Sequence, residues 1–146
     1  MSLKEEDRQT LVELELEKAD KTFKQVAVLQ REGYWDTMAN RLYYSLFHAV
    51  SALLINDKRE VGSHKGAAIR FHQYYVKTGL FTAEEGSLYT QMESLRETSD
   101  YNCYFDVTES DIVSKVAPAE LFIDKIKQYI AENNKLRTRE HSSQQL

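Results

Sequence analysis

Apolar residues recur along most of this chain at intervals of three and four, the spacing that places them on one face of an α-helix. The pattern is densest from Leu42 to Ile55, where eleven of fourteen residues are apolar or aromatic and none is charged. A helix that is apolar nearly all round belongs in the interior of a protein. This segment therefore predicts a central helix, from about Trp35 to Asn56. No stretch shows the alternation typical of a strand.

Amphipathic segments flank this central helix on both sides. Before it, apolar residues at heptad-like spacing predict a helix of about 25–30 residues. That helix ends at Gly33, because glycine suits the left-handed position after a helix. Behind the central helix, Ser63 is the expected N-cap of a third helix that ends at Gly79. Thr82 with Glu85 then forms a capping box that opens a fourth helix.

A fifth helix is expected to open at Thr108, with Asp111 completing a second capping box. Pro118 should kink this helix or split off its first turn, because an interior proline costs about 3 kcal/mol. Residues 134–146 are polar, and we expect them to form a disordered tail. Long amphipathic helices with short loops predict an all-α fold, an up-and-down four-helix bundle with an additional short or kinked helix. Residues 1–133 would form this single domain.

Length and composition narrow the class of protein. The chain has 146 residues, one cysteine and a net charge of −4. A lone Cys103 excludes an intrachain disulfide, and no Cys and His set has metal-ligand spacing, so we expect no metal and no cofactor. The polar N-terminus lacks the apolar core of a signal peptide, and no apolar run reaches the roughly 20 residues of a membrane helix. These features favour a cytoplasmic protein with no membrane contact.

Charge is unevenly distributed. Residues 57–79 carry five Lys or Arg against two acids, whereas residues 82–111 carry eight acids against one base, Arg96. The chain therefore has no long basic stripe of the kind that binds a phosphate backbone, and it gives no strong signal for general nucleic-acid binding.

Two groups of polar residues interrupt the apolar pattern. One lies on the central helix, where four polar residues share a face; the other surrounds Arg96. Because an unpaired buried polar group costs about 1–3 kcal/mol, we expect the groups to meet, with Arg41 opposite Asp100. Arg96 and Asp100, four residues apart, could also pair locally. The two groups could form a satisfied structural network, or a cleft in which Arg96 binds a carboxylate or a phosphate in bidentate fashion. The candidate ligand-binding residues are Arg41, Tyr44, Ser45, His48, Arg96 and Asp100.

Motifs for other chemistry are absent. There is no Gly-rich phosphate loop, no G-x-S-x-G and no H-E-x-x-H. His64 is expected in the first turn of the third helix, with His72 two turns further on. Neither has a partner at metal-ligand spacing, so the sequence gives them no role.

The order of these landmarks resembles the HEPN family of bacteria and archaea, over roughly residues 10–130. On the central helix the pattern A-x-R-x-Y-Y-x-x-F-H-A begins at Ala39. It is followed by Ser-His-Lys-Gly from Ser63 and by F-x-x-x-Y-V-K-x-G-x-F from Phe71. The last landmark is an R-x-x-x-D-Y turn that begins at Arg96.

The resemblance implies a helical bundle that is usually a dimer and is often encoded beside a minimal nucleotidyltransferase in a toxin–antitoxin-like pair. Active members are metal-independent RNases with the motif R-x(4–6)-H, in which Arg stabilises the phosphate and His moves protons. Here Arg96 matches, but Tyr101, Asn102 and Cys103 stand where the His would be. An unperturbed Tyr titrates near 10, far from the pKa near 7 that suits general acid–base catalysis.

We therefore expect a non-catalytic HEPN protein that binds a nucleotide or a protein partner. It would be a homodimer paired with a minimal nucleotidyltransferase. The alternative is a metal-independent RNase toxin in which Arg96 acts with His48 or Tyr101, and a third interpretation is a structural helical adaptor. In some family modules the nucleotidyltransferase adenylylates a Tyr close to the motif, which marks Tyr101 and Tyr104 as candidate modification sites.

Overall fold

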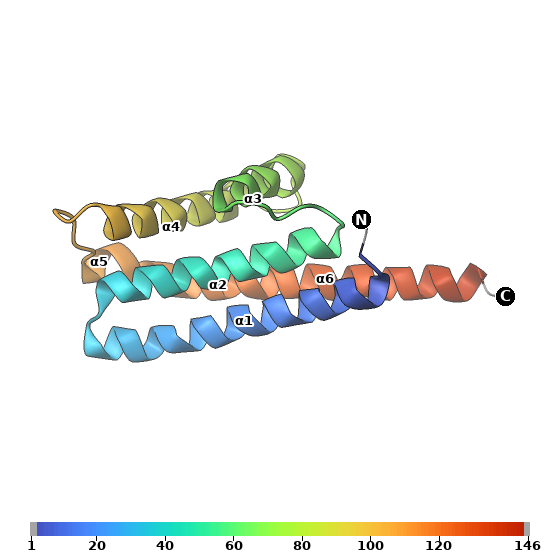
Figure 1. Cartoon of the computed structure of the whole chain (residues 1–146), viewed down its shortest axis with the longest axis horizontal. Helices are drawn as coiled ribbons and strands as arrows, with labels where there is room; N and C mark the ends of the chain where they lie inside the picture. The colour runs from blue at the N-terminus through green and yellow to red at the C-terminus, as the bar shows by residue number, and fades with distance from the viewer. Residues whose placement is uncertain (1–2, 145–146) are drawn as a thin grey trace.

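The computed structural model of the chain describes residues 3–144, and this part of the chain contains helices and no strand (Figure 1). A π-helical turn, His72–Val76, continues α3, and a 3₁₀ turn, Val113–Lys115, precedes α6. In chain order the α-helices are α1 (Glu5–Glu32), α2 (Trp35–Asn56), α3 (His64–Phe71), α4 (Ala83–Tyr101), α5 (Glu109–Ile112) and α6 (Val116–Gln144).

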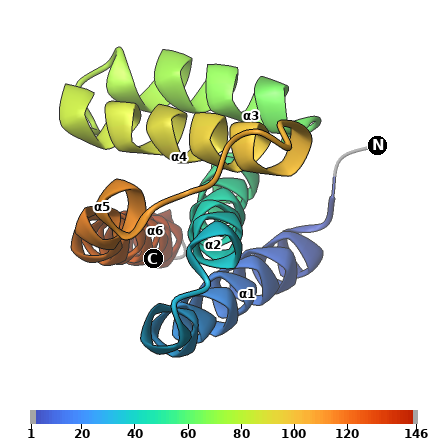
Figure 2. The same cartoon turned by 90° about the vertical axis from the view of Figure 1, so that its left-hand side faces the viewer.

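Helix α2 lies at the centre of the bundle. It packs against α1, α4 and α6, with α1 antiparallel to it and the α3–α4 pair on another side (Figure 2). Thirteen of its residues are buried, among them Leu42, Leu46 and Leu53, which have no exposed surface. The predicted central helix and the predicted bundle are thus confirmed.

The helix ends follow the local signals in the sequence. Gly33 ends α1 in the left-handed conformation, with a φ of 74°. Ser63 caps α3, its side chain accepting a hydrogen bond of 3.0 Å from the backbone of Gly66. Thr82 and Glu85 form the predicted capping box at the start of α4.

Pro118 divides the last predicted helix in two. The short α5 ends at Ile112, and α6 starts only at Val116 after the 3₁₀ turn. Pro118 consequently falls in the first turn of α6, where a missing N–H breaks no intrahelical hydrogen bond. The predicted splitting of a first turn is confirmed.

The segment after residue 133 differs from the predicted tail. Helix α6 continues through it to Gln144, and residues 145–146 of the expected tail lie outside the described part. The physical reason is contact with the bundle, because Arg137 donates a hydrogen bond of 3.1 Å to the carbonyl of Asn56 and lies 3.9 Å from the carboxylate of Glu5. A cation is favourable at the carbonyl end of α2.

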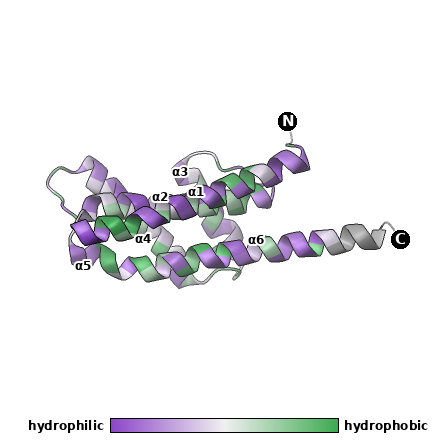
Figure 3. Ribbon diagram, turned by 90° about the horizontal axis from the view of Figure 1, so that it is seen from below, coloured by the Kyte–Doolittle hydropathy of each residue, from purple (hydrophilic) through white to green (hydrophobic). Residues whose placement is uncertain are grey.

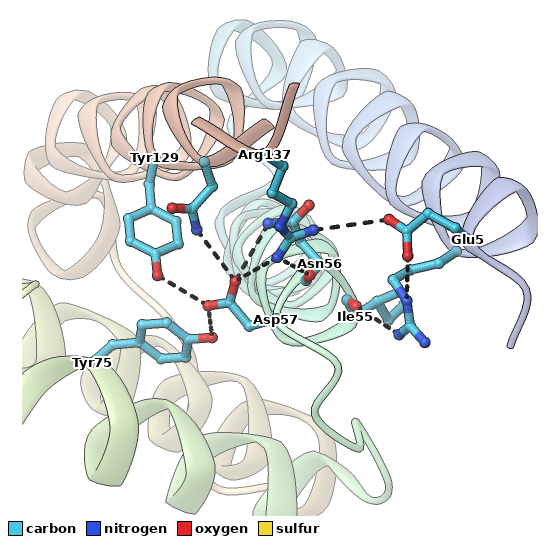
Figure 4. Close-up of polar contacts among 9 residues, drawn as sticks. Glu5, Ile55, Asn56, Asp57, Tyr75, Tyr129 and Arg137 are labelled. Carbon is cyan, nitrogen blue, oxygen red and sulfur yellow. Dashed lines mark hydrogen bonds and ion pairs between the residues drawn. The ribbon is translucent and has the colours of Figure 1, made fainter. Parts of the chain in front are cut away.

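The same end of α2 carries a dense polar network (Figure 4). The Asp57 carboxylate accepts hydrogen bonds from Tyr75 at 2.6 Å, Tyr129 at 3.1 Å and Asn133 at 3.4 Å. We call Asp57, Tyr75, Tyr129, Asn133 and Arg137 the Asp57 cluster. It joins α2, α6 and the π-helical turn after α3.

Residues 57–63 lead from this cluster back along α2, so that α3 begins above the middle of α2 (Figure 1). The reversal uses positive φ angles of 61° at both Lys58 and Gly62. Arg70 fixes the loop by donating a hydrogen bond of 3.1 Å to the carbonyl of Val61.

Polar and apolar residues alternate along the surfaces of α1 and α6 (Figure 3). Among the described residues, no helix combines the length and the apolar character needed to cross a bilayer.

Candidate functional site

Between α1 and the α3–α4 pair, α2 keeps one partly exposed strip (Figure 1). The strip contains Arg41, Tyr44, Phe47 and His48, all of which are half-buried. Three of these four are candidate residues from the sequence. The strip is therefore where the candidate site must be sought.

Arg96 reaches this strip from the C-terminal half of α4. Its guanidinium carbon lies 4.8 Å from the ring centre of Tyr43 and 5.8 Å from that of Tyr44, within cation–π range. Its ion pairs are long, with Asp100 at 3.5 Å and Glu97 at 3.8 Å. Well-formed charged hydrogen bonds are about 2.7–2.9 Å. Arg96 is only 7% exposed, and its Nε has no hydrogen-bond partner, so the cation is held in place with donors to spare.

His64, the first residue of α3, joins the same aromatic surface. Its Nδ1 shares a hydrogen bond of 2.8 Å with the hydroxyl of Tyr43, and its ring lies 4.2 Å from that of Phe47. Burial lowers the pKa of His64, and the positive charge of Arg96 lowers it further. The imidazole is therefore neutral at pH 7. We call Arg96, Tyr43, Tyr44, Phe47 and His64 the Arg96 cluster.

Tyr43 is the buried link between these groups, with no exposed surface. Burial, reinforced by the negative charge of Glu93, raises the pKa of Tyr43 to about 12. The hydroxyl thus keeps its proton and can donate it to the neutral His64 imidazole. Behind it, the ring of Tyr89 lies 6.2 Å away, and the buried hydroxyl of Tyr89 has no partner.

His48 is held on the other side of the strip. Its Nδ1 lies 2.7 Å from the carboxylate of Glu15 on α1. Its ring is 6.3 Å from that of Tyr44, so it borders the Arg96 cluster, but its described hydrogen bond runs to α1. The sequence alone could not decide whether His48 faced Arg96.

The predicted pairing of Arg41 with Asp100 is wrong. Arg41 donates hydrogen bonds of 2.6 and 3.0 Å to the side chain of its neighbour Asn40. Asp100 pairs instead with Arg96, one helical turn before it. A hollow of about 340 Å³ beside Asp100 is lined by Asn40 and not by Arg41. The guanidinium of Arg41 therefore bonds to the amide oxygen of Asn40 and not, as predicted, to the carboxylate of Asp100.

Ser45 is also turned away from the strip. It is completely buried, and its hydroxyl donates a hydrogen bond of 2.7 Å to the carbonyl of Leu42 within α2. Of the residues predicted to bind a ligand, the structure therefore brings together Tyr44, Arg96 and Asp100. Arg41, whose guanidinium lies 5.4 Å from the Tyr44 ring centre but is bonded to Asn40, and His48 border them.

Tyr101 and Tyr104 lie at the end of α4 and in the turn that follows it. They are 82% and 96% exposed, respectively, and no described contact joins either one to Arg96. Among the described residues, no group of three or more His, Cys, Asp or Glu is placed to hold a metal ion. A cation surrounded by aromatic rings and a neutral imidazole is suited to an anionic ligand.

Sequence reasoning missed His64. The Ser63 cap correctly placed it in the first turn of α3, but no local signal tells which residues of α2 lie beneath that turn. The Ser-His-Lys-Gly landmark was the one hint in the sequence, and the hydrogen bond to Tyr43 gives it a structural meaning.

Comparison with known proteins agrees with this fold. The HEPN domain matches residues 12–129. A UPF0332 protein of Thermotoga maritima is 29% identical over 126 residues, which cover 86% of this chain and 96% of the relative. Two proteins of Methanocaldococcus jannaschii, named "Putative toxin MJ0605" and "Putative toxin MJ0142", are 30% and 27% identical, covering 87% and 84% of this chain and 91% and 83% of the relatives. Matched over most of its length, the chain belongs to the HEPN domain family.

Proposed function

We propose that this protein is a non-catalytic HEPN protein that binds the phosphate of a nucleotide at the Arg96 cluster. The observation that carries the proposal is the state of Arg96, which is buried, stacked on Tyr43 and left with an unpartnered Nε. A guanidinium presents donors in a planar fork that matches phosphate oxygens. Its long ion pairs with Asp100 and Glu97 leave room for a stronger anionic partner.

Binding without cleavage is supported by the residues around Arg96. In this chain no His follows Arg96 at the spacing of the HEPN motif, and the two residues considered as substitutes do not complete it. His48 is bonded to Glu15, and Tyr101 is exposed at the end of α4. The acidic segment from 82 to 111 would also weaken the attraction of a long RNA backbone.

A protein partner is the second part of the proposal. Two relatives carry toxin names, which supports a toxin–antitoxin-like pair with a minimal nucleotidyltransferase. The exposed Tyr101 and Tyr104 are accessible to such an enzyme for modification. The homodimer remains a proposal from the family resemblance.

The test is ligand-induced stabilisation, measured by thermal unfolding with a panel of ribonucleoside triphosphates and with an oligouridylate. A ligand at a hundredfold excess over its Kd stabilises the folded state by about 2.7 kcal/mol. We expect this stabilisation for the wild type, its loss in Arg96→Gln, and its retention in Arg41→Gln. The Arg41 variant is the matched control, because Arg41 lies on the same face with its guanidinium bonded to Asn40. If no nucleotide stabilises the wild type, the proposal is wrong.

The toxin names of the relatives also favour testing the alternative, a metal-independent RNase. Labelled RNA is incubated with the protein in the presence of EDTA. Cleavage that disappears in Arg96→Gln would establish the RNase and overturn the non-catalytic assignment, whereas intact RNA supports binding alone.

A further inference from the structure

We propose that His64 is a second phosphate-binding residue of the Arg96 cluster, and that it takes up a proton when the phosphate binds, with Tyr43 changing from hydrogen-bond donor to acceptor. This inference rests on the proposed function, because it concerns the same ligand. It adds His64 of α3 to the binding residues and predicts that affinity depends on pH.

The position of His64 carries the first step. Its ring and the guanidinium of Arg96 both lie against Tyr43 and Tyr44, with His64 5.7 Å and Arg96 4.8 Å from the Tyr43 ring centre. The Nδ1 of His64 is occupied by the Tyr43 hydroxyl, and no hydrogen bond is found for Nε2 among the described residues. With Nδ1 accepting a hydrogen bond, Nε2 carries the proton and can donate it to a phosphate oxygen.

The second step concerns the proton balance. A bound phosphate places negative charge beside an imidazole that burial and the charge of Arg96 keep neutral, and it thereby favours the imidazolium form. The added proton comes from solvent and binds Nδ1, which then donates to the Tyr43 oxygen. The Tyr43 proton must turn to another acceptor. The nearest candidate is the buried hydroxyl of Tyr89, which has no hydrogen-bond partner among the described residues; the ring centre of Tyr89 lies 6.2 Å from that of Tyr43.

Other groups around His64 could contribute to a pH dependence, and they dictate the controls. The charged and titratable groups facing it from the packed helices are Tyr43, Tyr44 and His48 of α2, and Arg96 and Glu97 of α4. Of these residues, His48 is the only other histidine. His48 is bonded to Glu15, so His48→Gln is the matched control.

The test measures affinity for a ten-nucleotide oligouridylate with hydroxyl ends, at several pH values from 8 to 5.5, by fluorescence anisotropy. Neither the phosphodiesters nor uracil titrate in this range. We expect the wild-type affinity to rise as the pH falls, by at most tenfold per pH unit for one proton. In His64→Gln the affinity at pH 6 should fall about tenfold and the slope should vanish. His48→Gln should keep the wild-type dependence of affinity on pH. A separate titration with a ribonucleoside triphosphate at pH 7.5 tells whether a free nucleotide is bound as well as RNA.

A second measurement needs no variant. The pKa of His64, followed by NMR of its ring Cε1 proton, should rise on addition of the oligouridylate, while that of His72 stays constant. His72 is bonded to Thr90 on the α3–α4 face.

The outcomes separate this inference from the proposed function. If Arg96→Gln abolishes binding while His64→Gln changes neither affinity nor slope, the inference is overturned and the proposed function stands. If binding depends on His64 and survives Arg96→Gln, the assignment to Arg96 is overturned. If the wild type binds neither probe, both are overturned.

Discussion

The Asp57 cluster and the Arg96 cluster both place a largely buried charge beside tyrosines, yet the polar contacts of the two charges differ. Asp57 accepts a hydrogen bond of 2.6 Å from Tyr75 and one of 3.1 Å from Tyr129, from two different parts of the chain. Among the described residues, the ion pairs of Arg96 are 3.5 and 3.8 Å long, and its Nε has no hydrogen-bond partner.

The contrast shows that residue type does not distinguish a structural network from a candidate binding site in this protein. The number and length of the internal contacts do so. The Asp57 carboxylate accepts short hydrogen bonds that join helices, whereas Arg96 is positioned by aromatic rings and its Nε has no hydrogen-bond partner.

The largest expected effect on stability is at Asp57. Asp57→Ala should lower the free energy of unfolding by about 3 kcal/mol, because it leaves two tyrosine hydroxyls without their acceptor and removes one ion pair of Arg137. Urea unfolding measures the change. Asp124→Ala, at an exposed position of α6, is the control and should change stability by less than about 0.5 kcal/mol. Equal effects of the two variants would show that the Asp57 cluster does not hold the helices together.

A smaller loss is expected at the rim of the same cluster. Arg137→Gln removes the donor to the Asn56 carbonyl and the ion pairs to Glu5 and Asp57, but its side chain is 40% exposed. We expect a cost of about 1 kcal/mol in urea unfolding. Helicity by circular dichroism should fall as well, because the end of α6 loses its attachment. Unchanged helicity and stability would argue that this end of α6 needs no such contact.

Replacing Arg96 should have the opposite effect, with little change in stability and a loss of ligand binding. Replacing a poorly paired buried ion by an apolar residue of similar length is often neutral, so Arg96→Met should change stability by less than about 1 kcal/mol while removing nucleotide binding. Both are measured on the same sample, by urea unfolding and by anisotropy. A loss as large as that of Asp57→Ala would mean that Arg96 belongs to a structural network.

The smallest effect concerns the pH dependence of stability. Burial lowers the pKa of His64 and of His72 below the usual value, so the unfolded chain binds protons that the folded chain does not. Their contribution to stability is therefore present above the unfolded pKa of about 6.5 and is lost as the pH falls below it. Urea unfolding at pH 7 and 5.5 should show a shallower loss in His64→Gln than in the wild type. A steeper loss of stability in His64→Gln would show that folding raises the pKa of His64 and does not lower it.

Much of the fold follows from local signals. Ser63, the Thr82–Glu85 box and Pro118 each act within a few residues, so the sequence shows where helices begin and break. The end of α6 does not follow from such signals, since a polar segment is held in place by Arg137 through contacts with α1 and α2.

The candidate site was only partly predictable for the same reason. The sequence selected Tyr44, Arg96 and Asp100, but which side chains meet across helices depends on how the helices are rotated and shifted against each other. Arg41 donates to the side chain of its neighbour Asn40 and does not pair with Asp100 across the helices. His64 owes its place to a loop reversal, which composition does not reveal.

That loop also couples the two clusters. It begins at Asp57 in one cluster and delivers His64 to the other, so residues 57–63 act as a spacer of fixed length. Because α3 is an independent helical segment with its own cap, an added residue in the spacer could leave every helix intact and still carry His64 off Tyr43. In this protein the length of a surface loop therefore determines which residues make up the Arg96 cluster.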